Sequence, residues 1–509
     1  MHAEESKGPE ERGSSHAGPG LSLWLTPGLS NTVLRRGRMR EQPASREQST
    51  PGAARPLPSL RVLDVVALTV GVVLGAGIFK APSLVAEQSA SGAQMLLAWG
   101  LGGVASLVGA LCYAELASAW PHPGGDYHYL YRALGRGPAF LFAWARLTII
   151  PTGSIALLAF VFGDYASQLF SLGPASSSLY AAAMVVGLTA VNVAGVRQGT
   201  RTQNLLTLLE VLGVLAVILA GLVLAPPAAQ TATTVPAAPS GTSWGLAMVF
   251  VLLTYGGWNE VAYLSAEMKR SRRGLAWALL VSIGVVTLLY LLVNLAYLRG
   301  LGLEGMAASE AVAADVMQRA LGSTGAVVLS ILIALSALTS ANATVLTGAR
   351  TQYAFGKDSL LFNALGQWHA RANTPTRALL VQGAISLALV GLGALTRQGF
   401  QTMVEYTAPV FWLFFLLTGV SLLVLRVREP DAPRPFRVPL YPLTPLLFIA
   451  VCGYVLYSSL AYTGLGAVAG LVVLAVGGVL LAVEVARGRR SPRGVGMRAR
   501  PFDSPKEAT

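Results

Sequence analysis

The segments VLGAGIF (residues 73–79) and TYGGWN (residues 254–259) each place glycines in the middle of a long apolar run. Glycine is a poor helix former, so each cluster is expected to interrupt a helix. Hydrocarbon has no water to satisfy free N–H and C=O groups, and an unwound segment at that depth persists only where it faces a cavity or a ligand. Two interruptions therefore predict one shared binding site. The alternative is that these glycines only allow close helix packing.

The composition is that of a membrane protein. The chain has 509 residues, of which 53% are hydrophobic and only 12% are charged. Such a balance indicates an all-α polytopic membrane protein, because a membrane-crossing helix needs about 20 apolar residues. Twelve apolar runs meet this length, which places both termini on one side. They lie near residues 63–87, 93–119, 138–166, 177–195, 203–225, 244–266, 275–298, 324–349, 376–395, 400–425, 440–461 and 464–486.

The Lys and Arg residues behind the net charge of +13 are divided unequally between the two sides of the membrane. Nearly all Lys and Arg fall in segments that share one side, whereas Arg299, Arg319 and Arg397 fall on the other. The positive-inside rule therefore predicts that both termini are cytoplasmic. The plasma (inner) membrane is the expected location. A nucleic-acid surface would not alternate from loop to loop, so no nucleic-acid partner is expected.

Three regions are expected along the chain. Residues 1–58 are rich in Gly, Pro, Ser and Arg and predict a disordered, basic cytoplasmic extension, within which Met39 is an alternative start. Residues 59–487 are expected to form a twelve-helix domain, in which the shared binding site of the two interruptions would make the domain a transporter. Residues 488–509 are expected to be a disordered cytoplasmic tail.

The two interruptions lie five spans apart, as two inverted five-helix repeats would place them. Repeat one would cover about residues 63–225 and repeat two about 244–425, with extra helices at about 440–486. An interrupted helix has free N–H groups and a partial positive charge at its new amino terminus, which suits a carboxylate. The amides of residues 76–79 are predicted to hold one. Carbonyls freed near residues 71–74 and 255–258 would accept hydrogen bonds from an ammonium, so the predicted ligand is an α-amino acid.

Four segments resemble the amino acid–polyamine–organocation permeases, and most closely their L-type amino acid transporter branch. They are TVGVVLGAGIFKAP (69–82), YAELASAWPHPGGDYHYL (113–130), YGGWNEVAYLSAEMK (255–269) and NATVLTGARTQYAFGKD (342–358). The resemblance covers about residues 60–487. It implies a LeuT-type five-plus-five inverted repeat with discontinuous helices 1 and 6. It also implies secondary active transport of neutral L-amino acids by alternating access, with no enzymatic activity and no cofactor.

The resemblance also assigns site residues. The substrate carboxylate would bind at Gly75, Ala76, Gly77 and Ile78. The amino group and side chain would meet Tyr255, Gly256, Gly257, Trp258 and Asn259. Where the L-type relatives have an aromatic gate, this chain has Leu253, with Phe250 one turn away.

Glu210 departs from the family pattern, since many relatives have a lysine there. An acid within a membrane span is costly. Three interpretations compete: a proton-titrating coupling group, a cation ligand, or a neutral carboxyl that hydrogen-bonds a Ser or Thr. Exchange and proton-coupled symport both stay open. Ser336, Thr339 and Ser340 either ligate a cation with the first-span carbonyls or bond to their own backbone.

Other charged residues carry further predictions. Glu115 and Arg146 are expected to pair near the cytoplasmic ends of adjacent spans, either locking an inner gate or only neutralising each other. Lys80 is expected to reach the outer interface or to face substrate. Glu260 decides between a neutral substrate and the alternative of a cationic amino acid or polyamine carrier. A membrane sensor or scaffold without transport is the alternative of a different class.

Two absences in the sequence bear on partners. No cysteine lies in residues 166–178, where heteromeric relatives join a heavy subunit, so no disulfide-linked heavy subunit is expected. The two cysteines, Cys112 and Cys452, both fall within spans. No metal-ligand pattern is found, so no metal is expected.

Overall fold

The structure of the protein is a computed structural model. The structure describes residues 62–122, 124–195, 200–228, 243–260, 272–359, 361–369, 374–396, 398–461 and 464–490. The predicted extension at residues 1–58 lies outside these ranges, as does the predicted tail, except for residues 488–490, which continue the last helix.

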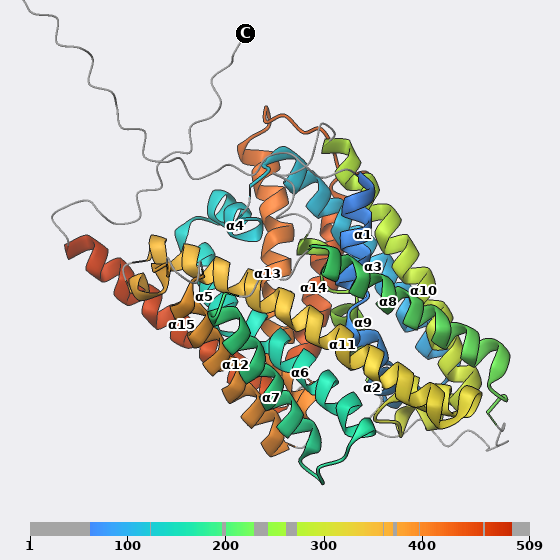
Figure 1. The fold of residues 1–509 in the computed structure, drawn as a ribbon. Coiled ribbons are helices and arrows are strands. Elements are labelled where there is room, and N and C mark those ends of the chain that lie inside the picture. The colour runs from blue at the N-terminus through green and yellow to red at the C-terminus, as the bar shows by residue number, and fades with distance from the viewer. Residues whose placement is uncertain are drawn as a thin grey trace, which may run out of the picture. The chain divides into compact units, whose positions relative to one another are not determined.

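The described residues form helices and connecting loops, with one isolated β-bridge between His369 and Thr374. Figure 1 shows the arrangement of the helices. Their bounds are α1 (Val62–Val73), η1 (Ala76–Phe79), α2 (Ala81–Glu87), α3 (Gly92–Ala119), α4 (Asp126–Leu134), α5 (Arg136–Thr148), α6 (Ile150–Leu169), α7 (Ser176–Val193), α8 (Thr200–Leu219), η2 (Ala220–Leu224), α9 (Trp244–Thr254), α10 (Arg272–Ala307), α11 (Val312–Asp358), η4 (Asn363–Gly366), α12 (Thr376–Thr396), α13 (Gly399–Arg428), α14 (Leu443–Ala461) and α15 (Leu465–Arg490).

Nine helices of the described residues are long and apolar enough to cross a membrane. The chain is therefore a multi-pass membrane protein. Predicted span 63–87 is divided into α1, η1 and α2, and predicted span 203–225 contains a shorter apolar helix over residues 208–224. Predicted span 244–266 begins as α9 and continues beyond the described residues. The total of twelve spans thus stays a prediction.

Helices from the two halves of the chain pack against one another. Figure 1 shows α6, α7, α11 and α12 side by side, and α6 packs against α11 as α7 does against α12. Likewise, α3 packs against α10 and α2 against α9. The interior therefore forms between segments that are distant in sequence.

Glycines on α3 bring the second interruption close to this helix. A Cβ atom at Gly102 would lie 3.1 Å from a ring carbon of Tyr255, and one at Gly109 would lie 2.8 Å from the ring of Trp258. A Cβ at Gly102 would also clash with the side chain of Val251, so neither position has room for a larger residue. These glycines therefore serve close packing, and they determine where the two aromatic rings lie.

Candidate functional site

The first interruption lies between α1 and η1, as predicted. Leu74 N–H makes the last α-type bond, to Val70 O at 2.8 Å, and Gly75 then turns the chain with φ −42° and ψ 169°. The N–H groups of Gly75, Ala76 and Gly77 have no acceptor among the described residues. The N–H of Ile78 bonds instead to Gly75 O at 3.4 Å. The free donors are therefore three consecutive amides, beginning one residue earlier than the predicted set.

The second interruption follows α9, also as predicted. Tyr255 N–H still bonds to Val251 O, and the next bond, from Gly256 N–H to Leu253 O, is already a tight turn. Gly257 then has φ +108°, a conformation that strongly favours glycine. Residues 261–271, which complete the predicted span, lie outside the described residues.

The two interruptions lie against each other. A Cβ atom placed on Gly77 would lie 3.4 Å from Thr254 Cγ2, and one on Gly257 would lie 3.3 Å from Val72 O. The side chain of Val72 nevertheless stays 49% exposed. The structure thus brings together residues that are about 180 positions apart. The first interruption contributes both the unbonded amides and the carbonyl of Val72, which has no donor among the described residues, and the second interruption lies against them.

Tyrosine hydroxyls form hydrogen bonds with other backbone carbonyls at the ends of the interrupted segments. Tyr290 Oη, on α10, lies 2.6 Å from Val73 O and 3.2 Å from Thr254 O, so it contacts the last residue of both α1 and α9. Tyr165 Oη, on α6, donates to Phe79 O at 2.9 Å. These tyrosines were not among the residues predicted from the sequence. A lone tyrosine in an apolar run such as LLYLLVN (288–294) is the available signal, since a buried phenol hydroxyl needs a partner.

The aromatic residues of the second interruption pack against neighbouring helices. Tyr255 is buried and donates to Trp99 O at 3.0 Å. The ring of Trp258 meets Tyr113 edge-on, with 5.1 Å between centroids. Trp258 also lines a cavity of about 10 Å³ beside Phe415, which has room for at most a single water molecule. Tyr255 and Trp258 therefore form a packed aromatic wall in this conformation.

The remaining predicted residues of the site are mostly enclosed. Ala76, Ile78, Phe250 and Asn259 are buried, while Leu253 and Gly256 are half-buried. The carbonyl of Phe250 accepts a bond from the Thr254 hydroxyl at 2.7 Å.

Glu210 is buried on α8, where its Oε1 accepts a hydrogen bond from the Ser336 hydroxyl at 2.5 Å. Thr339 donates to Leu335 O of its own helix, and Ser340 is half-buried. The structure thus pairs two of the predicted coupling residues. The hydroxyl of Thr339 bonds to the backbone of its own helix, as Ser and Thr hydroxyls in helices ordinarily do.

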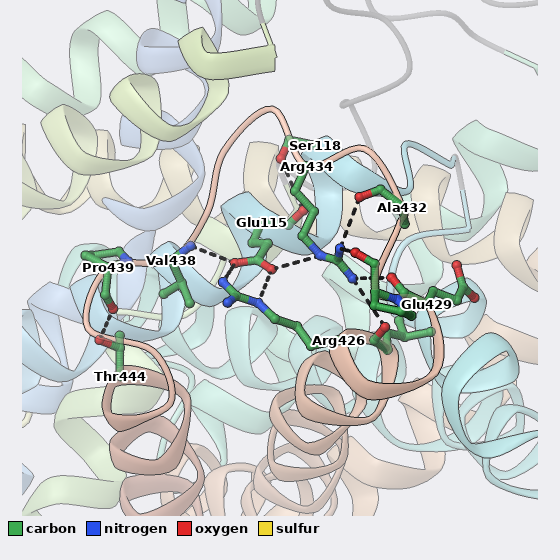
Figure 2. A network of polar contacts seen from close by, with 11 residues as sticks. Glu115, Ser118, Arg426, Glu429, Ala432, Arg434, Val438, Pro439 and Thr444 are labelled. Carbon is green, nitrogen blue, oxygen red and sulfur yellow. Dashed lines mark hydrogen bonds and ion pairs between the residues drawn. The ribbon is translucent and has the colours of Figure 1, made fainter.

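The predicted pair between Glu115 and Arg146 is wrong. Glu115 accepts from Arg426 Nε at 2.7 Å and Nη2 at 2.6 Å, and from Val438 N–H at 2.6 Å, while Arg434 Nε lies 3.5 Å away (Figure 2). The carboxyl-terminal end of α13 brings Arg426 to α3, and the chain beyond it turns back over the same carboxylate. The partner of Glu115 is therefore determined by packing between helices that are distant in sequence, and not by the order of the spans along the chain.

Arg146 instead pairs with Glu260, at 3.4 Å between Nη1 and Oε1. Arg146 is largely buried, whereas the Glu260 side chain is 42% exposed. The carboxylate that follows the second interruption therefore has a cationic partner within the protein.

Lys80 is held by two groups directly after η1. Its Nζ lies 2.8 Å from Asp164 Oδ2 on α6 and donates to Glu310 O at 2.9 Å. The ammonium thus joins the first interruption to α6 and to the loop that precedes α11.

His122, in the loop between α3 and α4, stacks on His128 of α4, with ring centroids 4.2 Å apart. Burial, together with the positive charges of His122 and Arg132, lowers the pKa of His128 to about 4. Arg132 also forms a two-bond ion pair with Glu429, which holds the pKa of that carboxyl below its usual value. No group of three or more metal-ligating side chains occurs among the residues for which the structure gives positions.

A multi-pass bundle in which two interrupted helices meet is the arrangement of a solute transporter. The chain belongs to the amino acid permease family: the profile described as "Amino acid permease" matches residues 60–481. It is therefore an amino acid transporter and not an enzyme.

Curated relatives agree with this assignment. The b(0,+)-type amino acid transporter 1 of Mus musculus is 31% identical over 431 residues, which are 83% of this chain and 86% of the relative. The large neutral amino acids transporter small subunit 2 of the same organism is 31% identical over 83% of this chain and 80% of its own length. The cystine/glutamate transporter of Pongo abelii is 30% identical over 80% of this chain and 82% of its own length.

Proposed function

We propose that this transporter carries neutral L-amino acids across the plasma membrane by alternating access. One observation supports this most strongly: the three unbonded N–H groups of Gly75, Ala76 and Gly77 lie against the second interruption. Consecutive free amides at the start of a helical turn suit a carboxylate. The carbonyl of Val72, which has no donor among the described residues, lies beside Gly257 and suits an ammonium group.

The Arg146–Glu260 ion pair favours a neutral substrate side chain. Glu260 is the acid nearest in sequence to the second interruption, and Arg146 already compensates its charge. A cationic amino acid or a polyamine would need an uncompensated carboxylate at the site. Uptake of labelled arginine therefore distinguishes a carrier of cationic amino acids from a carrier of neutral ones.

The fold is proposed to be a five-plus-five inverted repeat within a domain of residues 59–487. The helix pairs α2 and α9, α3 and α10, α6 and α11, and α7 and α12 are all in contact, and each pair is five predicted spans apart. Helices α14 and α15 would be the added pair. Both termini would be cytoplasmic by the positive-inside rule.

Glu210 is proposed as the coupling residue if transport is driven by protons. It is a buried membrane acid whose side-chain oxygen bonds to Ser336 on α11. α11 also packs against η1, so proton uptake at Glu210 has a structural route to the carboxylate site. Glu210→Gln should flatten the pH dependence of uptake, and an unchanged profile would assign Glu210 a structural role.

The transporter is proposed to act without a disulfide-linked heavy subunit, although one relative has "small subunit" in its name. Both cysteines of the chain, Cys112 and Cys452, are buried. Neither is available for a bond to another chain.

The test is uptake into liposomes that contain the purified full chain. Labelled alanine, serine, leucine and arginine are each supplied with and without internal substrate, and with and without a pH step. Stimulation by internal substrate indicates exchange, and stimulation by the pH step indicates proton symport. Gly77→Leu should abolish uptake while the protein stays in the membrane. If none of the four amino acids accumulates or exchanges, the proposed substrate class is wrong.

A further inference from the structure

A cavity of about 510 Å³ lies where the start of α10 meets the chain between α13 and α14. Trp277 and Leu280 of α10 line one side, and Arg434, Phe436 and Arg437 line the other. None of these residues belongs to the interruptions or to the Glu210 pair. The cavity thus combines cationic and aromatic side chains at a helix end, away from the proposed substrate site.

The chain that carries the two arginines is held in place on both sides of Arg437. Arg434 donates to Glu429 O at 2.6 Å, Pro430 O at 2.9 Å and Ala432 O at 3.0 Å (Figure 2). Val438 N–H donates to the buried Glu115 carboxylate at 2.6 Å. The backbone on either side of Arg437 is therefore pre-organised.

The guanidinium of Arg437 is an unpaired charge among the described residues that line this cavity. The residue is exposed, and its side chain has no partner among the described residues. Arg434, by contrast, uses its donors on backbone carbonyls. A planar guanidinium on a fixed backbone is well suited to bind a phosphate.

An apolar face of α10 continues from the cavity. Trp277 is 66% exposed, and the same face carries Val281 at 45%, Val285 at 42% and Leu288 at 59% exposure. These positions are three or four residues apart, so they form one stripe along the helix. In a membrane protein such a stripe is covered by acyl chains, and tryptophan is typical of the level of the lipid headgroups.

We propose that this cavity binds an anionic phospholipid, with its phosphate at Arg437 and an acyl chain along the α10 stripe. The charge of Arg437 selects an anionic headgroup, and Trp277 lies between headgroup and acyl chain. The lipid would contact Arg434 and hence lie next to the Glu115 carboxylate, which joins α3 to α13.

The test is a fluorescence titration of the purified full chain in detergent micelles with phosphatidylglycerol that carries brominated acyl chains. The difference in quenching between wild type and Trp277→Phe reports lipid beside Trp277. Phosphatidylglycerol should quench this signal saturably and at lower concentration than brominated phosphatidylcholine. Arg437→Gln should raise the half-quenching concentration about fivefold, the effect of one basic side chain at a lipid surface. Arg437→Lys should lie nearer to wild type.

Arg377→Gln is the matched control, because Arg377 is an exposed arginine at the start of α12 and does not line the cavity. The half-quenching concentration of Arg377→Gln should equal that of wild type. Native mass spectrometry of lipid bound to wild type and Arg437→Gln gives a second readout that does not depend on Trp277→Phe. Equal quenching by both lipids, or wild-type binding by Arg437→Gln, would overturn the proposal. Complete displacement of the lipid by inorganic phosphate would assign the cavity to free phosphate instead.

Discussion

The Tyr290 hydroxyl oxygen lies 2.6 Å from the carbonyl oxygen of Val73, where the first interrupted helix stops. The same oxygen lies 3.2 Å from Thr254 O, where the second one stops. One side chain on α10 therefore links the two interruptions and satisfies backbone that would otherwise be unbonded in a dry interior. This contact explains how two broken helices persist next to each other.

Tyr290→Phe should lower the free energy of unfolding by about 1–3 kcal/mol, because it leaves the buried carbonyl of Val73 without its donor. Chemical denaturation of the purified protein in detergent measures this change. Tyr297→Phe on the same helix is the matched control, since the Tyr297 hydroxyl is buried with no hydrogen-bond partner among the described residues. Equal losses in the two variants would contradict a role for the Tyr290 contact.

Gly257→Ala should reduce uptake by about tenfold, a loss of roughly 1.4 kcal/mol of transition-state stabilisation. The residue has φ +108°, and an added Cβ would lie 2.8 Å from Val72 Cγ1. Both effects push the second interruption away from the first. Initial rates in liposomes measure the effect. Gly284→Ala is the control, because a Cβ there meets no atom within 4 Å, and its uptake should match wild type.

Glu115→Gln should cost about 3 kcal/mol of stability, the penalty for leaving a partly buried arginine without its carboxylate. Arg426 would lose a charged partner that it reaches with two bonds. Denaturant titration measures the loss. Glu304→Gln removes an exposed carboxyl and should change stability by less than about 0.5 kcal/mol. A Glu115→Gln protein as stable as this control would show that the cluster in Figure 2 does not hold α3 to α13.

Acid should destabilise the protein through His128. Its pKa is about 4 in the folded protein and about 6.5 in the unfolded chain, so the unfolded chain binds the extra proton as pH falls. The stabilising effect of a neutral His128 is therefore fully present above pH 6.5 and is lost progressively down to pH 4. His122 and Arg132 oppose protonation of His128, and Glu429 favours it.

Thermal unfolding between pH 7.5 and pH 5 measures this effect. The melting temperature of His128→Gln should fall less over this range than that of wild type. His369→Gln, which replaces an exposed histidine after η4, should keep the wild-type slope. Parallel slopes for wild type and His128→Gln would show that His128 does not cause the acid sensitivity.

The interruptions were predictable from sequence because their cause is local. Gly75, Gly77 and Gly257 lower helix propensity within a few residues, and the surrounding apolar runs are just as local. The pairing of Glu115 was not predictable. Its partner Arg426 is 311 residues away, and several arginines near that end of the bundle were equally plausible on sequence grounds.

Hydropathy and glycine placement alone thus predicted a polytopic helical protein in which α1 and α9 end at glycine clusters, since both properties act over a turn or a span. Tertiary packing alone decided which helix ends touch. It also decided which tyrosine forms hydrogen bonds with them and which arginine pairs with Glu115. Tyr290 and Val73 are 217 residues apart, and the rotation of each helix in the bundle determines whether their atoms meet. That rotation depends on every neighbouring helix at once, so no single stretch of the chain contains it.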